Sequence, residues 1–98
     1  MKSLELNRWY AGEDEICISL LRYYVDITIC KNDEFIFYRL RVIDEDRKEL
    51  IFNFYSLEDA VRFTEDTINK CITSEEIINS YDKQFKNNKF KSIKKVKR

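Results

Sequence analysis

Hydrophobic and polar residues alternate in three consecutive segments of the chain, covering about residues 21–30, 35–42 and 50–55. A period of two in β-branched and aromatic sequence predicts strands. The polar segments 31–34 and 44–49 lie between them and predict turns, so the three strands form an antiparallel meander. The residues expected to point toward the core are Tyr23, Val25, Ile27 and Ile29, then Ile36, Tyr38, Leu40 and Val42, and finally Leu50, Phe52 and Phe54.

The period changes at Ser56, where a helix is predicted over about residues 57–71. Ser56 is followed three residues later by Asp59, a spacing typical of an N-cap. Two pairs at i, i+4, Glu58 with Arg62 and Asp66 with Lys70, favour the helix further. Its predicted buried face consists of Leu57, Ala60, Val61, Thr64, Ile68 and Cys71.

A second helix is predicted from the capping pattern Thr73-Ser74-Glu75-Glu76, with Asn87-Asn88 as its end. Its inner stripe is Ile77, Ile78, Tyr81 and Phe85. Continuing the rotation of about 100° per residue takes Phe90 and Ile93 off this stripe. The sequence therefore predicts one α+β domain over residues 1–88, followed by a flexible basic tail over residues 89–98.

The N-terminal twenty residues are harder to place. Leu4, Leu6, Trp9 and the segment 16–20 are apolar enough for short strands, but the polar segment 12–15 interrupts them. We therefore expect a three- or four-stranded antiparallel meander followed by two C-terminal helices packed on one face, in the order β-β-β-α-α.

Charge divides the chain into two parts. Residues 1–82 contain ten Lys or Arg and all eighteen Asp or Glu, whereas residues 83–98 contain eight Lys or Arg and no acid. The formal neutrality of the chain is the sum of an acidic body and a basic end. Local charge density, rather than the total, guides the choice of partner.

Composition argues against several classes of activity. The chain has no His and one Gly, which removes the usual general base, the usual zinc ligand and the glycine-rich phosphate loops. Cys17, Cys30 and Cys71 form no C-x-x-C pair and are predicted to be reduced thiols of a cytoplasmic protein. No uncharged run reaches the roughly 20 residues that a membrane span needs. We expect a protein that is not an enzyme, needs no cofactor or metal and does not bind membranes.

One catalytic pattern remains, Asp46-Arg47-Lys48, which has the D-x-K spacing of metal-dependent nucleases. A second ligand would have to come from Asp33 or Glu34. Because all of these residues lie in predicted turns, a solvated hairpin loop is the favoured interpretation.

The sheet face that points away from the predicted helices is the main candidate for a partner-binding site. Arginine beside Phe and Tyr is the enrichment found in binding hot spots, whereas a solvated face would carry more Lys, Glu and Thr. Two alternatives stay open: coverage of this face by Trp9 and the N-terminal strand, or a homodimer. The candidate residues are Tyr24, Phe35, Phe37, Arg39, Arg41, Asn53 and Tyr55.

Acidic clusters, among them Asp44, Glu45 and Asp46, are a second candidate for protein binding, because they match a positively charged nucleic-acid channel on another protein. In size, element order and charge, residues 20–85 resemble the small inhibitors that phages and mobile elements encode against host nucleases, including some anti-CRISPR proteins. The resemblance implies a non-enzymatic inhibitor or adaptor of nucleic-acid-processing machinery.

The alternative function is direct RNA or DNA binding by the basic tail, since phosphate contacts need positive charge and little geometry. The candidate residues for this are Lys86, Lys89, Lys91, Lys94, Lys95, Lys97 and Arg98.

Overall fold

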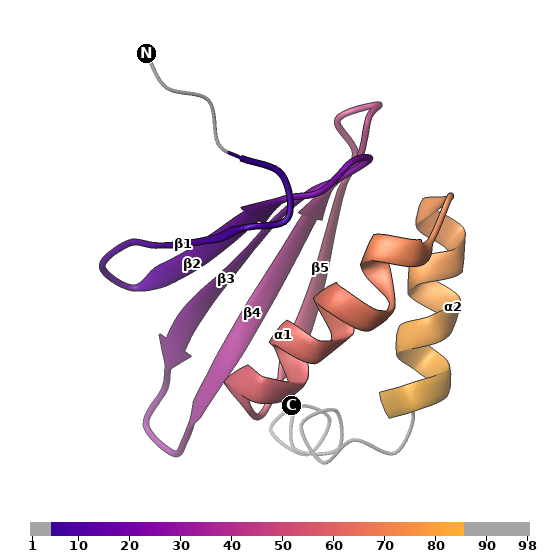
Figure 1. Ribbon diagram of the computed structural model, residues 1–98. Helices are drawn as coiled ribbons and strands as arrows, with labels where there is room; N and C mark the ends of the chain where they lie inside the picture. Colours follow the sequence, from indigo (N-terminus) through magenta and orange to yellow (C-terminus); the bar gives the residue numbers. More distant parts are fainter. Residues whose placement is uncertain (1–4, 86–98) are drawn as a thin grey trace.

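The computed structural model describes residues 5–85, which form a five-stranded antiparallel sheet followed by two α-helices (Figure 1). The α+β class and the meander are confirmed, whereas the predicted three or four strands are too few. Each strand pairs with the next along the chain, in the order β1 (Trp9–Ala11), β2 (Glu15–Ser19), β3 (Tyr24–Lys31), β4 (Ile36–Ile43) and β5 (Glu49–Phe54).

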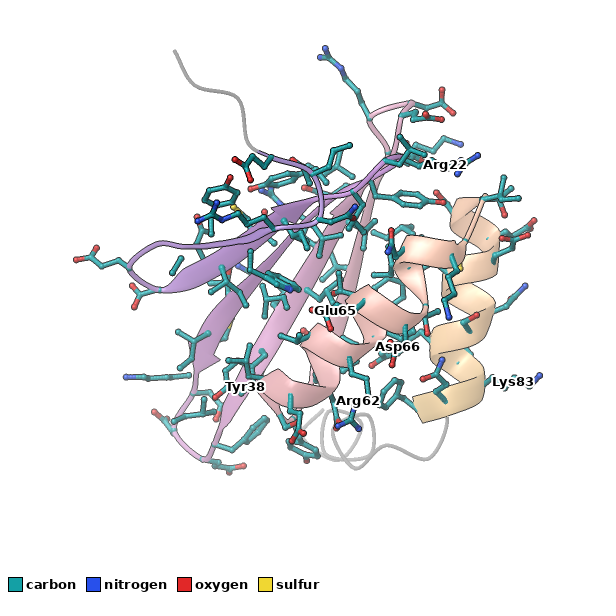
Figure 2. The ribbon with its side chains drawn as sticks, viewed as in Figure 1. Arg22, Tyr38, Arg62, Glu65, Asp66 and Lys83 are labelled. Atoms are coloured by element: carbon teal, nitrogen blue, oxygen red, sulfur yellow. The ribbon has the colours of Figure 1, made fainter. Side chains whose placement is uncertain are left out.

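The additional strand belongs to an N-terminal hairpin. The polar segment that interrupts the sequence pattern is the hairpin turn, closed by the Gly12 N–H donating to the Glu15 carbonyl at 2.7 Å. Trp9 pairs with Ile18 across β1 and β2, and its indole N–H donates to Glu65 Oε2 of the first helix at 2.9 Å. Glu65 extends from that helix toward the hairpin (Figure 2). Trp9 therefore lies on the helix side, and the expectation that it covers the opposite face is wrong.

The predicted inner residues of β3, β4 and β5 share the face that the helices cover. The register places Val25 opposite Val42 and Leu40 opposite both Ile27 and Phe52. Val25, Leu40 and Val42 are completely buried. Ile36 lies on the same face but is 48% exposed, because it is the first residue of β4, at the end of the sheet.

Helix α1 (Leu57–Asp66) crosses this face of the sheet (Figure 1). Ser56 caps it as predicted, its hydroxyl oxygen accepting the Asp59 N–H at 3.0 Å, and Arg62 pairs with Glu58 at 2.9 Å. The prediction that the helix continues to Cys71 is wrong. A 3₁₀ turn, η1 (Ile68–Lys70), follows Thr67 and brings Ile68 into the core, so the i, i+4 spacing of Asp66 and Lys70 no longer lies on a helix.

Helix α2 (Ser74–Phe85) lies beside β5 (Figure 1). Thr73 Oγ1 accepts the Glu76 N–H at 3.2 Å, and Glu76 Oε1 in turn accepts the Ile72 N–H at 2.8 Å. Ile77 is buried, but Ile78 is 38% exposed and does not belong to the inner stripe. A helix at the edge of a sheet buries a narrower stripe than one lying across its face. The predicted end of this helix, at Asn87-Asn88, lies outside the described residues.

A cluster of aromatic rings joins both helices to β5. Phe63 is almost fully buried, although it lies outside the predicted face of α1, because α1 contacts the sheet with one face and α2 with the adjacent one. The Tyr81 hydroxyl also donates to the Asn53 carbonyl at 2.7 Å, which satisfies a backbone group at the edge strand. The rings that contact one another in this cluster have centroids 4.7–6.0 Å apart, and they belong to Phe52, Phe54, Phe63, Tyr81 and Phe85.

Candidate protein-binding face

The sheet face opposite α1 carries side chains from all five strands, and we call it the open face. The register pairs Asp26 with Arg41 and Thr28 with Arg39 across β3 and β4. Across β4 and β5 it pairs Arg39 with Asn53. The open face consists of Tyr10, Glu15, Cys17, Ser19, Tyr24, Asp26, Thr28, Cys30, Phe37, Arg39, Arg41, Ile43, Glu49, Ile51 and Asn53.

An ion pair between a buried carboxylate and a half-buried arginine lies at the centre of the open face. Arg41 donates from Nε and Nη2 to Asp26 Oδ2, at 3.1 and 2.7 Å, and from Nη1 to Glu49 Oε2 at 3.0 Å. Asp26 is only 4% exposed, so Arg41 offsets the cost of burying the Asp26 carboxylate. The hydrogen bond with Asp26 raises the pKa of Arg41. Arg41, expected to bind a partner, is thus engaged within the sheet by Asp26, which was not among the residues predicted for the site.

Arg39 lies two residues away on the same face in a different environment. Its cross-strand neighbours are Thr28 and Asn53, and between residues 5 and 85 its guanidinium has no hydrogen bond or ion pair. The side chain is exposed and borders a hollow of about 450 Å³, whose other lining residues are Glu15, Asp26, Thr28, Arg41, Glu49 and Ile51. A planar guanidinium with five N–H donors is well suited to bind a carboxylate from outside the sheet.

Three half-buried rings meet at one end of the open face, and we call Phe35, Phe37 and Tyr55 the aromatic corner. The Phe35 centroid lies 5.8 Å from that of Phe37 and 6.0 Å from that of Tyr55. Asn32 Oδ1 holds the adjoining turn by accepting the N–H groups of Glu34 and Phe35. Because Phe37 precedes Arg39 by two residues of β4, the corner adjoins the Arg39 hollow.

Tyr24 lies toward the other end of the open face, where β3 meets β2. Burial, and next a hydrogen bond with Cys17, raise the pKa of the Tyr24 phenol, so the group stays neutral at physiological pH. Cys17, Cys30 and Cys71 are free thiols. The structure thus brings Tyr24, Arg39, Arg41 and Asn53 onto one face with the aromatic corner at its edge.

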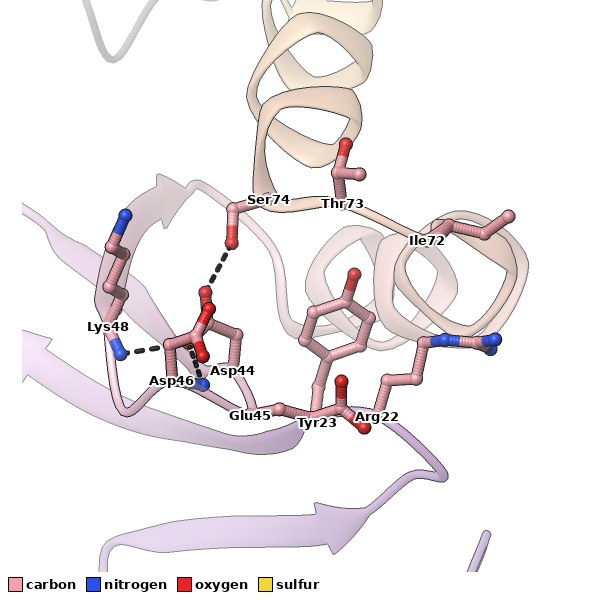
Figure 3. Close-up of a pocket in the computed structure, with 9 residues that line it drawn as sticks. All are labelled: Arg22, Tyr23, Asp44, Glu45, Asp46, Lys48, Ile72, Thr73 and Ser74. Atoms are coloured by element: carbon pink, nitrogen blue, oxygen red, sulfur yellow. Dashed lines mark hydrogen bonds between the residues drawn. The ribbon is translucent and has the colours of Figure 1, made fainter.

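In the acidic turn between β4 and β5, Asp44 has a different role from Glu45 and Asp46 (Figure 3). Asp44 Oδ1 accepts the N–H groups of Asp46 and Lys48, both at 2.9 Å, and its Oδ2 accepts the Ser74 hydroxyl at 2.7 Å. The bond from Ser74, followed by that from the Lys48 backbone, lowers the pKa of Asp44. Asp44 therefore ties this turn to the start of α2, while Glu45 and Asp46 are exposed.

The same turn contains the D-x-K pattern, and its geometry does not support a shared metal site. Asp33 and Glu34 lie in the turn before β4, whereas Asp46 lies in the turn after it. The eight residues of β4 separate the two turns by about 25 Å. Arg47 occupies the left-handed region with φ 68°, a turn position that usually favours glycine.

The residues expected to bind nucleic acid lie outside the described part of the chain, so that alternative stays a prediction. They are Lys86, Lys89, Lys91, Lys94, Lys95, Lys97 and Arg98.

Comparison with protein-family models, with curated proteins and with solved structures finds no match to this chain. Neither helix within residues 5–85 combines the length and the apolar character that crossing a bilayer requires.

Replacing the two arginines of β4 should separate their roles. Arg41→Ala leaves the Asp26 carboxylate buried without its cation and should lower the free energy of unfolding by about 2 kcal/mol. Arg39→Ala removes an exposed side chain and should change it by less than about 0.5 kcal/mol. Urea denaturation at pH 7 measures both. Equal losses would contradict the assignment of Arg41 to the fold and of Arg39 to binding.

The Asp44 carboxylate should make stability depend on pH. Because its folded pKa is lowered, its contribution is present above the unfolded value near 4 and is lost as pH falls through the folded value. Asp44→Asn should therefore lower the thermal midpoint at pH 7, and the difference from wild type should shrink below about pH 4. Thermal unfolding at several pH values measures this. A difference that stays constant down to pH 2 would be inconsistent with the Asp44–Ser74 tie.

Proposed function

We propose that the chain is a non-enzymatic, cytoplasmic protein-binding module whose partner contacts the open face around Arg39. The observation that carries the proposal is the exposed guanidinium of Arg39, which borders a hollow and has no partner among residues 5–85. Arginine and aromatic side chains dominate binding energy in protein interfaces, especially beside surfaces that exclude water.

The ion pair next to Arg39 supports this proposal. Arg41 binds both Asp26 and Glu49, so neither acid is left to pair with Arg39 within the sheet. Fixed neighbours lower the entropic cost of binding, because few side chains must be ordered when a partner arrives. The N-terminal strand extends the sheet at its edge and leaves the Arg39 side chain exposed, while a second copy of the chain remains an alternative occupant.

We propose further that the partner is a nucleic-acid-processing enzyme, which the chain inhibits or adapts. This part rests on charge. All eighteen acidic residues lie within residues 5–82, and Glu45 and Asp46 are exposed on the turn between β4 and β5. A surface of this sign is complementary to a channel that binds phosphates. The resemblance to phage-encoded and anti-CRISPR-like inhibitors, in size, element order and charge, is consistent with such a partner.

Charge reversal at Arg39, compared with reversal at Arg62, tests the binding face. Arg62 lies on α1, away from the open face, and is similarly exposed (Figure 2). With the partner isolated by pulldown from native lysate and then purified, Arg39→Glu should weaken binding at least tenfold in calorimetry. Arg62→Glu should stay within about twofold of wild type, since an exposed charge outside an interface contributes little.

Two results would contradict the proposal. One is unchanged partner binding by a folded Arg39→Glu variant. The other is self-association in sedimentation experiments that Arg39→Glu abolishes, which would assign the open face to a homodimer.

Reversal of Glu45 and Asp46 to Lys tests the charge argument separately and leaves the Asp44–Ser74 bond in place. Unchanged affinity for the partner in that variant would remove the acidic turn from the interface.

A further inference from the structure

An apolar groove lies on the helix side of the sheet, between the β1–β2 hairpin and the start of α1. Helix α1 lies over β4 and β5, so the inner face of β2 and β3 beside it is only partly covered (Figure 1). Ile16, Ile29 and Tyr38 are half-buried there, and Leu57, predicted to be buried, is 40% exposed. These four side chains and Ile27 line a hollow of about 240 Å³. The described helices therefore leave an apolar surface open at this place.

The size of the hollow suits one side chain rather than a whole small molecule. Small-molecule pockets usually enclose about 300–1,000 Å³, whereas a cavity of about 150 Å³ holds a benzene ring. At about 240 Å³, the groove has room for an aromatic ring or a branched aliphatic side chain. Ile29 pairs with Tyr38 across its floor, and the hydrogen bond from Trp9 to Glu65 ties the hairpin to α1. Walls that are fixed in advance lower the entropic cost of binding.

Acidic side chains border the groove at the turn of the hairpin. Glu13, Asp14 and Glu15 line it, and all three are exposed. Within residues 5–85, no Lys or Arg lines the groove, and neither Glu13 nor Asp14 forms an ion pair. This charge repels phosphate groups and acidic segments, and it attracts lysine and arginine.

We propose that the groove binds a segment of another protein in which an apolar side chain is flanked by lysine or arginine residues. The apolar side chain enters the hollow against Tyr38 and Leu57, and the flanking cations face Glu13 and Asp14. Burial of the apolar side chain supplies affinity, and the acids select basic over acidic segments. The groove lies on the opposite face of the sheet from Arg39, so this inference does not rest on the proposed function.

A synthetic peptide, Lys-Lys-Leu-Phe-Lys-Lys, serves as the probe in a nuclear magnetic resonance titration of the full-length protein at physiological salt. We expect saturable shifts of the signals from Ile16, Ile29 and Leu57, with a Kd below about 1 mM. A peptide of the same charge with Ala in place of Leu and Phe should bind at least about fivefold more weakly, because it cannot fill the hollow.

Two charge reversals separate the groove from the overall negative charge of the protein. Glu13→Lys combined with Asp14→Lys should weaken binding of the probe at least about fivefold, because it removes the acids beside the hollow. Glu45→Lys combined with Asp46→Lys changes the net charge equally and should weaken binding less than about twofold. Its turn begins six residues after Tyr38 along β4, about 20 Å away, whereas charges are screened within about 8 Å at this salt concentration.

Three results would overturn the proposal. One is the absence of saturable shifts at the groove, and another is equal weakening by the two charge reversals. The third is prior occupation of the groove in the free protein. Nuclear Overhauser contacts from residues 86–98 to Leu57 would assign the groove to the basic end of the same chain, and self-association that Leu57→Lys abolishes would assign it to a second copy. Unchanged signals from Val25 and Ile77 in the core confirm that the variants are folded. Arg39→Glu should bind the probe as wild type does, so the outcome is independent of the proposed function.

Discussion

The aromatic cluster around Phe54 is the interaction on which the rest of the structure depends. It fixes α1 across one face of the sheet and α2 along β5, through ring contacts that Phe63 and Tyr81 share with Phe54. A chain of 98 residues can bury only one core, and this one places it on the helix side. The other face must therefore be stable in contact with water or with a partner.

The open face meets this requirement by dividing two roles between neighbouring arginines. Arg41 lies opposite a buried acid, Asp26, and completes an ion pair that belongs to the sheet. Arg39 lies opposite Thr28, which cannot neutralise it. One difference in the cross-strand residue therefore makes one arginine structural and leaves the other available for binding, although the two have nearly the same sequence environment.

Alternation predicted β3, β4, β5 and their buried faces, because long strands with one covered face show a clear period of two. It did not predict β1, whose three residues are too short for a period. The roles of Asp26, Asp44 and Phe63 were missed because each depends on a distant partner: Arg41 across the sheet, Ser74 thirty residues on, and Tyr81 of α2. Alternation was enough to predict which residues lie on the open face. It could not predict which of its charged side chains form ion pairs with each other.

The most direct test of the account is the solvent exposure of the two sheet faces in the full-length protein. Relaxation by a soluble gadolinium chelate should broaden side-chain signals of Ile51 and Asn53 on the open face about as strongly as those of Arg62 on α1. Signals of Ile27 and Phe52 in the core should be almost unaffected. Protection of Ile51 and Asn53 to the level of the core would show that this face is covered, and would contradict its role as the partner surface.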